Sequence, residues 1–273
     1  VPDLQPLVED AVADFVVRET HDLPADLLAL FEGSHLEGIA GLRRLARAVL
    51  GAPDIAILPD DVPPFDPAAW QAWKDSLSLV ARSWPGARDR VVACLVRAAE
   101  AGILKQTSYK PSQIQGKADA MDALARTIAD GPIDPFNPAF EVLAYFGRQK
   151  ILENVKVKVA APDLPAECDD LQDALATVAR GQECAHAWLT GVRTRFVDEV
   201  RRTVERRKRE GHVQGFDDLL RRLRDGLATG PGRDALRQAI ADQYRVAIID
   251  EFQDTDPVQW AIFSLLFTSP DDR

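Results

Sequence analysis

The sequence is poor in the features that mark secreted, zinc-binding and membrane-spanning proteins. Its three cysteines, Cys94, Cys168 and Cys184, include no C-x-x-C pair, which argues against a disulfide framework and a zinc knuckle and fits a reduced cytoplasmic setting. No apolar run approaches the roughly 18–20 residues that a membrane span needs. The chain starts Val1-Pro2-Asp3-Leu4, without an initiator Met or a basic-then-apolar signal pattern. We expect a cytoplasmic protein with no membrane contact, and this start suggests a piece of a longer polypeptide.

Common catalytic patterns are missing as well. No Ser/His/Asp arrangement and no metal-ligand spacing occurs, and we expect the Cys184-x-His186 pair to serve helix packing. The chain also has no internal repeat and no low-complexity segment. These absences leave the function to be carried by local stretches of charge and by one acidic motif near the C-terminus.

Length and composition indicate a soluble, folded chain. The 273 residues are 46% hydrophobic and 28% charged, enough for one large or two modest domains with a real core. The net charge of −10 argues against a surface that binds nucleic acid everywhere, although it permits a local basic strip.

Apolar residues recur at helical spacing along most of the chain, which predicts a mainly α fold. Trp70, Trp73, Leu77 and Val80 mark one helix, and its aromatic stripe is expected to be core. A further helix is predicted from Val91 to Leu104. The tract from Glu167 to Glu210 predicts one or two long helices.

One polar, mildly basic stretch in the middle of the chain is a candidate for DNA contact. The polar segment from Ile103 to Lys117 offers Lys, Ser, Thr and Gln donors that could bind phosphates, and an aromatic residue that we expect to be exposed. Its DNA-binding candidates are Lys105, Tyr109, Lys110 and Lys117. A smaller cluster follows at Arg148, Lys150, Lys156 and Lys158. The alternative for the segment 103–117 is an ordinary solvated loop.

The end of the long helical tract is also basic. Its DNA-binding candidates are Arg201, Arg202, Arg206 and Arg207. Acidic residues are interspersed among them, so the alternative is a salt-bridged, solvated helix with no ligand.

An apolar run ends in two adjacent carboxylates near the C-terminus. Residues 246–249, Val-Ala-Ile-Ile, predict a buried strand that delivers Asp250 and Glu251 to the edge of a sheet. Adjacent acids there suit a hydrated Mg²⁺, with the second acid free to orient or deprotonate a water. The alternative is a strand followed by a solvated acidic turn.

The residues around these acids resemble a known family. Asp250–Gln259 (Asp-Glu-Phe-Gln-Asp-Thr-Asp-Pro-Val-Gln) is similar to the Walker B region, motif II, of superfamily 1 DNA helicases of the UvrD/RecB type. The Thr-Asp-Pro ending is more similar to RecB, the beta subunit of exodeoxyribonuclease V, than to UvrD. The resemblance extends upstream through Gly215–Leu220 and covers about residues 213–267.

The resemblance implies roles for the motif residues. Asp250 would bind Mg²⁺, and Glu251 would position or activate the hydrolytic water. Gln253 would sense the γ-phosphate and couple it to motor movement, while Asp254 and Thr255 would brace the loop. ATP and Mg²⁺ would thus be cofactors of the parent protein, with none expected on this chain alone.

The phosphate-binding loop that such a site needs, G-x-x-x-x-G-K-[ST], does not occur in the sequence. Gly116-Lys117 lacks the upstream glycine because position 111 is proline, and Ala118 replaces the hydroxyl residue. We therefore expect the isolated chain to be inactive in ATP hydrolysis.

The resemblance also implies a domain organisation. Residues 1–214 would form a helical insertion similar to helicase subdomain 1B, and residues 215–273 part of motor domain 1A with the Walker B motif. A single strand at 245–249 would lack its parent sheet, and so pair with another copy, pack on helices or be poorly ordered.

The implied function is ATP-driven engagement and unwinding of duplex DNA in double-strand break repair and recombination. The implied partners are double-stranded DNA ends and other subunits of a RecBCD-type complex. The alternatives are a helical protein-interaction module for partner subunits, or a UvrD-type helicase without a nuclease.

Overall fold

The computed structural model describes residues 5–51, 56–59 and 61–268, and these are mainly helical, as predicted. Residues 1–4 and 269–273, at the outer ends of the predicted domains, lie outside the described residues. The described residues contain one isolated β-bridge, between Leu104 and Val155. None of their helices is both long enough and apolar enough to cross a membrane.

The chain divides into two compact units. The larger comprises Val12–Arg201, and the smaller comprises Val1–Ala11 together with Arg202–Arg273. The helix α8 (Glu167–Glu210) is continuous and contributes to both units.

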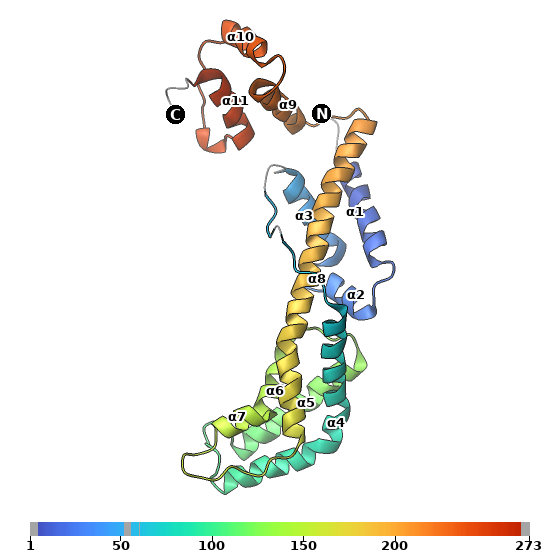
Figure 1. The fold of residues 1–273 in the computed structure, drawn as a ribbon, viewed down its shortest axis with the longest axis vertical. Coiled ribbons are helices and arrows are strands. Elements are labelled where there is room, and N and C mark those ends of the chain that lie inside the picture. Colours follow the sequence, from blue (N-terminus) through green and yellow to red (C-terminus); the bar gives the residue numbers. More distant parts are fainter. Residues whose placement is uncertain (1–4, 52–55, 60, 269–273) are drawn as a thin grey trace. The chain divides into compact units, whose positions relative to one another are not determined.

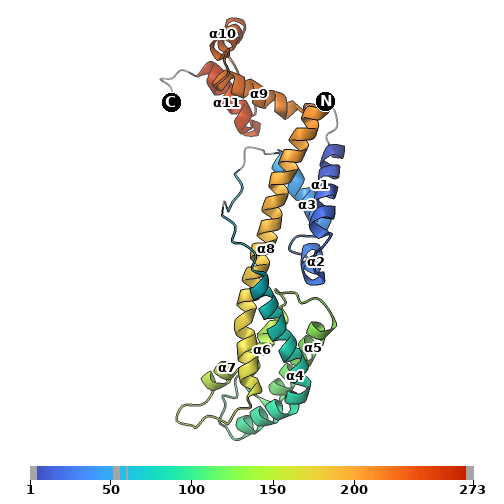
Figure 2. The same ribbon diagram turned by 45° about the vertical axis from the view of Figure 1, so that its right-hand side comes forward.

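The larger unit is built of helices. Besides most of α1 (Gln5–Thr20) and of α8, it contains α2 (Ala25–Glu32), α3 (Gly38–Gly51), α4 (Pro67–Glu100), α5 (Pro111–Asp130), η1 (Pro138–Phe140), α6 (Glu141–Phe146) and α7 (Arg148–Glu153). Figures 1 and 2 show α1 beside the C-terminal half of α8, where the rings of Phe15 and Phe196 meet edge to face with centroids 5.0 Å apart.

The helix α4 corrects the prediction of two separate helices between Trp70 and Leu104. It is a single helix of 34 residues that begins at an N-cap, where the Asp66 carboxylate accepts the N–H groups of Ala68 and Ala69 at 3.0 Å. Pro85 lies inside it and removes one backbone donor, which bends a helix without ending it when its flanks are well packed. Figure 1 shows α4 turning sideways in its second half. Leu104 lies beyond the end of the helix, in the β-bridge.

The predicted aromatic stripe of α4 is core. Trp70, Trp73, Leu77 and Val80 are all buried. The indole N–H of Trp70 reaches the carboxylate of Asp26 on α2 at 2.5 Å. The stripe therefore packs internally and offers no stacking platform for bases.

The predicted long tract forms one helix, α8, of 44 residues. Acids occupy its first turn and bases its last, which complements the helix dipole. Apolar residues at helical spacing in its second half form a buried stripe: Leu189, Val192, Phe196, Val200 and Val204.

The smaller unit contains α9 (Phe216–Ala228), α10 (Arg233–Gln243), η2 (Phe252–Asp254) and α11 (Pro257–Phe267), with α10 and α11 packed on α9. At the start of α9 the Asp218 carboxylate accepts the N–H of Gly215 at 2.8 Å. Asp256 caps α11 by accepting the N–H groups of Val258 and Gln259, at 2.7 and 2.9 Å.

The predicted strand at 245–249 does not form. These residues have no regular secondary structure, and Val246 and Ile248 are 75% and 93% exposed. A strand is stabilised by hydrogen bonds to neighbouring strands, and the described residues supply none to this segment. Ala247 and Ile249, between and after Val246 and Ile248, are half-buried.

Candidate functional site

The acidic loop, residues 250–256, connects the apolar run 246–249 to α11. Its first five side chains, from Asp250 to Asp254, are exposed. The Asp250 carboxylate accepts the N–H of Glu251 at 2.9 Å. Glu251 itself adopts the left-handed conformation, with φ 49° and ψ 50°, which is uncommon for a residue with a side chain. The chain therefore turns sharply between the two acids, a conformation often found at functional sites.

Backbone hydrogen bonds close the loop after this turn. The N–H of Asp254 donates to the carbonyl of Glu251 at 2.8 Å, and the N–H of Thr255 donates to that of Phe252 at 3.0 Å. The amide of Gln253 donates to the Glu251 carboxylate. The loop thus groups Asp250, Glu251 and Gln253, the three residues for which the resemblance implies roles at a nucleotide.

Aromatic packing anchors the loop to the following helix. The ring of Phe252 meets the ring of Trp260 on α11 edge to face, with centroids 5.2 Å apart and an interplanar angle of 84°. Together with the Asp256 cap, this contact fixes the acidic loop against the first turns of α11.

The donor set of the loop fits magnesium. Asp250 and Glu251 supply exposed carboxylate oxygens, and neither forms an ion pair with a lysine or arginine in the part of the chain that the structure describes. Mg²⁺ prefers oxygen ligands and is commonly bound through one or two carboxylates together with substrate phosphates and water. No group of three His, Cys, Asp or Glu side chains converges among the described residues. The loop thus offers part of a magnesium coordination shell.

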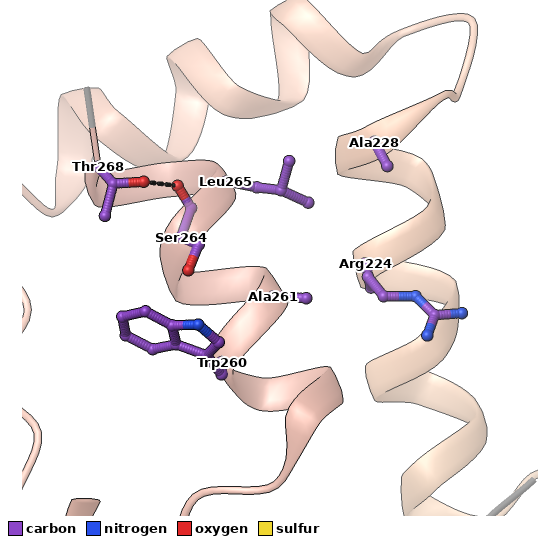
Figure 3. Close-up of a pocket in the computed structure, with 7 residues that line it drawn as sticks. All are labelled: Arg224, Ala228, Trp260, Ala261, Ser264, Leu265 and Thr268. Atoms are coloured by element: carbon purple, nitrogen blue, oxygen red, sulfur yellow. Dashed lines mark hydrogen bonds between the residues drawn. The ribbon is translucent and has the colours of Figure 1, made fainter. Parts of the chain in front are cut away.

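A pocket of about 520 Å³ opens nearby between α9 and α11 (Figure 3). Trp260, Ala261, Ser264, Leu265 and Thr268 line it from α11 and its end, and Arg224 and Ala228 line it from α9. None of the residues predicted to bind nucleotide lines this pocket. Its lining is mostly apolar, with Arg224, Ser264 and Thr268 as its polar residues.

The polar segment 103–117 corrects one prediction. Tyr109 is 1% exposed and its hydroxyl donates to the carbonyl of Tyr145 at 2.7 Å, while the Tyr145 hydroxyl donates to the carbonyl of Ser108 at 3.2 Å. Burial raises the pKa of Tyr145 to about 12 and that of Tyr109 still further. Tyr109 therefore fastens the start of α5 to α6, and it is not the exposed aromatic that the polar sequence around it suggests.

The lysines of this segment are exposed, and the β-bridge places them beside the second basic cluster. The N–H of Lys105 donates to the carbonyl of Asn154, and the N–H of Lys156 to that of Ile103, both at 2.9 Å. Two segments about fifty positions apart thus lie side by side at this bridge. We call the exposed lysines of the two stretches the lysine patch: Lys105, Lys110, Lys117, Lys150, Lys156 and Lys158. No local signal in the sequence shows this pairing.

Arg148, from the same second cluster, is engaged within the fold. Its guanidinium holds the Asp169 carboxylate on α8 through two hydrogen bonds, which lowers the pKa of that carboxyl. It fastens α7 to α8.

The basic end of α8 includes several internal pairs. Arg207 lies 3.7 Å from Asp10 and donates to the carbonyl of Leu7 at 3.4 Å. Arg201 and Arg202 also take part in side-chain interactions, whereas Arg206 is exposed. Part of this stretch therefore matches the salt-bridged alternative.

Comparison with known proteins shows the family of this chain. The family model of the UvrD/REP helicase N-terminal domain matches residues 104–272, more than half of the chain. The chain belongs to this family. The matched range includes the lysine patch, α8, α9 and the acidic loop.

Similar relatives carry the name RecBCD enzyme subunit RecB. The Mycobacterium tuberculosis protein is 46% identical over 79 residues, which is 28% of this chain and 7% of the relative. The Escherichia coli protein is 50% identical over 70 residues, which is 26% of this chain and 6% of the relative. The Mycolicibacterium smegmatis protein is 42% identical over 172 residues, 60% of this chain and 14% of the relative. The chain thus corresponds to a small part of these relatives' length.

Proposed function

We propose that this chain is part of the beta subunit of an ATP-dependent DNA helicase–exonuclease of the RecB type. Residues 1–214 would form a 1B-like accessory domain, and residues 215–273 a segment of motor domain 1A. The observation that carries the proposal is the acidic loop, in which Asp250, Glu251 and Gln253 are grouped and exposed within a UvrD/REP family match.

The acidic loop would act on MgATP in the parent protein. When bound, Mg²⁺ neutralises phosphate charge and orients the γ-phosphate for attack. Asp250 would supply a carboxylate oxygen to the ion. Glu251 would orient a water by accepting a hydrogen bond from it, and would take its proton as the water oxygen attacks the γ-phosphate. Gln253, which contacts Glu251, would link that carboxylate to the state of the γ-phosphate.

The lysine patch would contact duplex DNA. Its six exposed ammonium groups can bind backbone phosphates without regard to base sequence. The partners would be double-stranded DNA ends and other subunits of a RecBCD-type complex, in the cytoplasm, and the process would be double-strand break repair and recombination.

The isolated chain would not hydrolyse ATP, because its sequence holds no phosphate-binding loop to accompany the acidic loop. The ATPase test therefore uses the parent protein. We expect Glu251→Gln and Asp250→Asn each to lower DNA-stimulated ATP hydrolysis by roughly a hundredfold or more, as is typical when a group that stabilises the transition state is removed.

The matched control is Asp234→Asn, which makes the same change at an exposed acid of α10 paired with its neighbour Arg233. It should retain wild-type turnover. Full activity in the Asp250 and Glu251 variants would refute the assignment of the nucleotide site.

DNA contact can be tested on this chain directly. Fluorescence anisotropy with a labelled duplex should show binding that weakens steeply with salt, because phosphate contacts release counterions. The double variant Lys105→Gln, Lys156→Gln should bind more weakly and with a smaller salt slope. The control Arg82→Gln, Arg126→Gln removes equal charge from exposed positions elsewhere on α4 and α5.

Equal salt slopes in the two double variants would remove the lysine patch from the proposal. Absence of duplex binding, together with salt-insensitive binding to a partner subunit, would favour the alternative of a protein-interaction module.

A further inference from the structure

One half-buried carboxylate in the smaller unit is contacted by three donors, one each from α8, from α9 and from the connection between them. The Asp218 carboxylate accepts the N–H of Gly215 at 2.8 Å, lies 3.0 Å from the ammonium of Lys208 and lies 2.9 Å from the guanidinium of Arg221. The side chains of Lys208, Asp218 and Arg221 are only 12%, 14% and 19% exposed. We call these three side chains the Asp218 clamp.

The two cations of the clamp differ in what they connect. Arg221 lies one turn after Asp218 on α9, so that pair is internal to one helix. Lys208 lies in the last turn of α8, so its pair with Asp218 joins the end of α8 to the start of α9. Only the Lys208 pair crosses the short connection between these helices.

The Asp218 carboxyl is ionised near neutral pH. Burial by itself raises the pKa of the Asp218 carboxyl, but the Gly215 N–H and the Lys208 ammonium outweigh it and hold that pKa below its ordinary value. An ion pair with little exposure is weakly screened by salt. Removing one of its partners leaves the other charge with little solvent and no partner, which disturbs the local structure more than the loss of a surface pair does.

The packing within the smaller unit continues from α9 to the acidic loop. α11 packs on α9, where Ile262 and Leu227 are buried, and α11 holds the loop through the Asp256 cap and the Phe252–Trp260 contact. The single helix α8 begins in the larger unit and ends in the smaller one. The larger unit also carries the lysine patch. Within the smaller unit, a connected series of contacts thus runs from the last turn of α8 through the clamp and α9 to α11 and the acidic loop.

We propose that Asp218 is a positioning residue that, through Lys208, couples DNA engagement by the helical unit to ATP hydrolysis at the acidic loop. The inference rests on the proposed function, since it assigns a regulatory link between the DNA and nucleotide sites named there. Coupling of this kind changes how strongly DNA stimulates turnover and leaves the DNA-independent chemistry in place.

The test compares Lys208→Gln with Arg221→Gln in the parent protein. Both variants remove one cation from the same carboxylate, and both leave the Gly215 N–H on Asp218. We expect Lys208→Gln to lower the ratio of DNA-stimulated to basal ATP hydrolysis by roughly fivefold or more, the lower end of typical coupling factors. Arg221→Gln should leave that ratio within about twofold of wild type, and neither variant should change the basal rate or the KM for ATP by more than about twofold.

Asp218→Asn should match Lys208→Gln, because the amide still accepts the Gly215 N–H but no longer attracts the ammonium. Circular dichroism melts of the three variants show whether each is folded. If Asp218→Asn is unfolded, the Lys208 and Arg221 variants decide the question alone.

If the wild-type parent hydrolyses ATP and the two variants Lys208→Gln and Arg221→Gln have equal ratios of DNA-stimulated to basal hydrolysis, this inference is overturned and the proposed function stands. A wild-type parent that hydrolyses no ATP, with or without DNA, would overturn both.

Discussion

The two units differ in how completely they bury their apolar residues. The larger unit holds four of the five tryptophans, and Trp70, Trp73, Trp84 and Trp188 are at most 5% exposed. In the smaller unit the remaining tryptophan, Trp260, is 45% exposed, and α11, an almost wholly apolar helix, buries only Ile262 among its residues. Further large apolar residues of the smaller unit are exposed: Phe216, Leu219, Leu236, Tyr244, Val246, Ile248 and Phe252.

The difference teaches which parts of the fold depend on local sequence. A helix satisfies its backbone groups within itself, so the helices of the larger unit need only bury their apolar stripes against one another. A strand needs hydrogen-bond partners from other segments, so the run 246–249 forms no strand where the described residues supply none. The larger unit is thus a self-contained core, and the smaller unit presents apolar surface.

The largest expected effect on stability is the difference between removing a tryptophan from the larger unit and removing one from the smaller unit. Trp73→Ala empties a fully buried site on α4 and should lower the free energy of unfolding by about 3–5 kcal/mol. Trp260→Ala removes a half-exposed ring and should cost only about 1 kcal/mol. Urea denaturation followed by circular dichroism measures both changes. Equal losses would mean that the smaller unit has as complete a core as the larger.

A smaller effect should appear at a close approach of α8 to α4. A Cβ atom on Gly181 would lie 2.5–2.6 Å from three ring atoms of the buried Trp73, far too close for contact. Gly181→Ala should therefore destabilise the chain by about 1–3 kcal/mol. Gly116→Ala is the matched control on α5, where a Cβ meets nothing within 4 Å, and it should stabilise by about 0.5–1 kcal/mol because alanine favours the helix. Thermal melts of the two variants should shift in opposite directions, and a shared direction would contradict the tight α4–α8 packing.

Much of the larger unit could be predicted from the sequence, because its information is local. The aromatic stripe of α4 and the buried stripe of α8 follow from apolar residues at helical spacing. The two apolar stripes that predicted two helices belong to one helix: Trp73, Leu77, Val91 and Leu95 are buried on both sides of Pro85, and this packing outweighs one lost hydrogen bond.

The candidate sites were harder to predict where they depend on distant contacts. The acidic loop could be recognised because its residues are consecutive. The lysine patch could not, because a single bridge between Leu104 and Val155 brings two segments together. The burial of Tyr109 was also hidden, since its partner Tyr145 lies 36 positions away in the sequence. The pair of Lys208 with Asp218 depends on how the chain turns between α8 and α9.

The acid stability of the larger unit should depend on Asp26. Burial raises the pKa of this carboxyl, but the Trp70 indole N–H and the Lys74 ammonium, at 2.5 and 3.0 Å, together lower it below its ordinary value. A carboxyl with a lowered folded pKa stabilises the fold above its unfolded pKa of about 3.9, and this contribution is lost as pH falls through the folded pKa.

Asp26→Asn should therefore be less stable than wild type by about 1 kcal/mol near neutral pH, and the difference should shrink below about pH 4. Urea denaturation at a series of pH values, followed by tryptophan fluorescence, measures it. Asp22→Asn, an exposed acid near the same helix, should follow the wild-type pH curve. A constant difference between Asp26→Asn and wild type at every pH would show that the charge of Asp26 is not the cause.

The smallest effect on stability is expected at the acidic loop itself. Asp250 is exposed, and its one hydrogen bond, from the N–H of Glu251, can be accepted equally well by an amide oxygen. Asp250→Asn should therefore change the free energy of unfolding of this chain by less than about 0.5 kcal/mol in urea denaturation. The same substitution is expected to abolish most ATP hydrolysis in the parent protein, and the contrast is what separates a chemical role from a structural one. If Asp250→Asn destabilised the chain as much as Gly181→Ala, the carboxylate would be part of the fold, and its exposure would no longer support a role in binding magnesium.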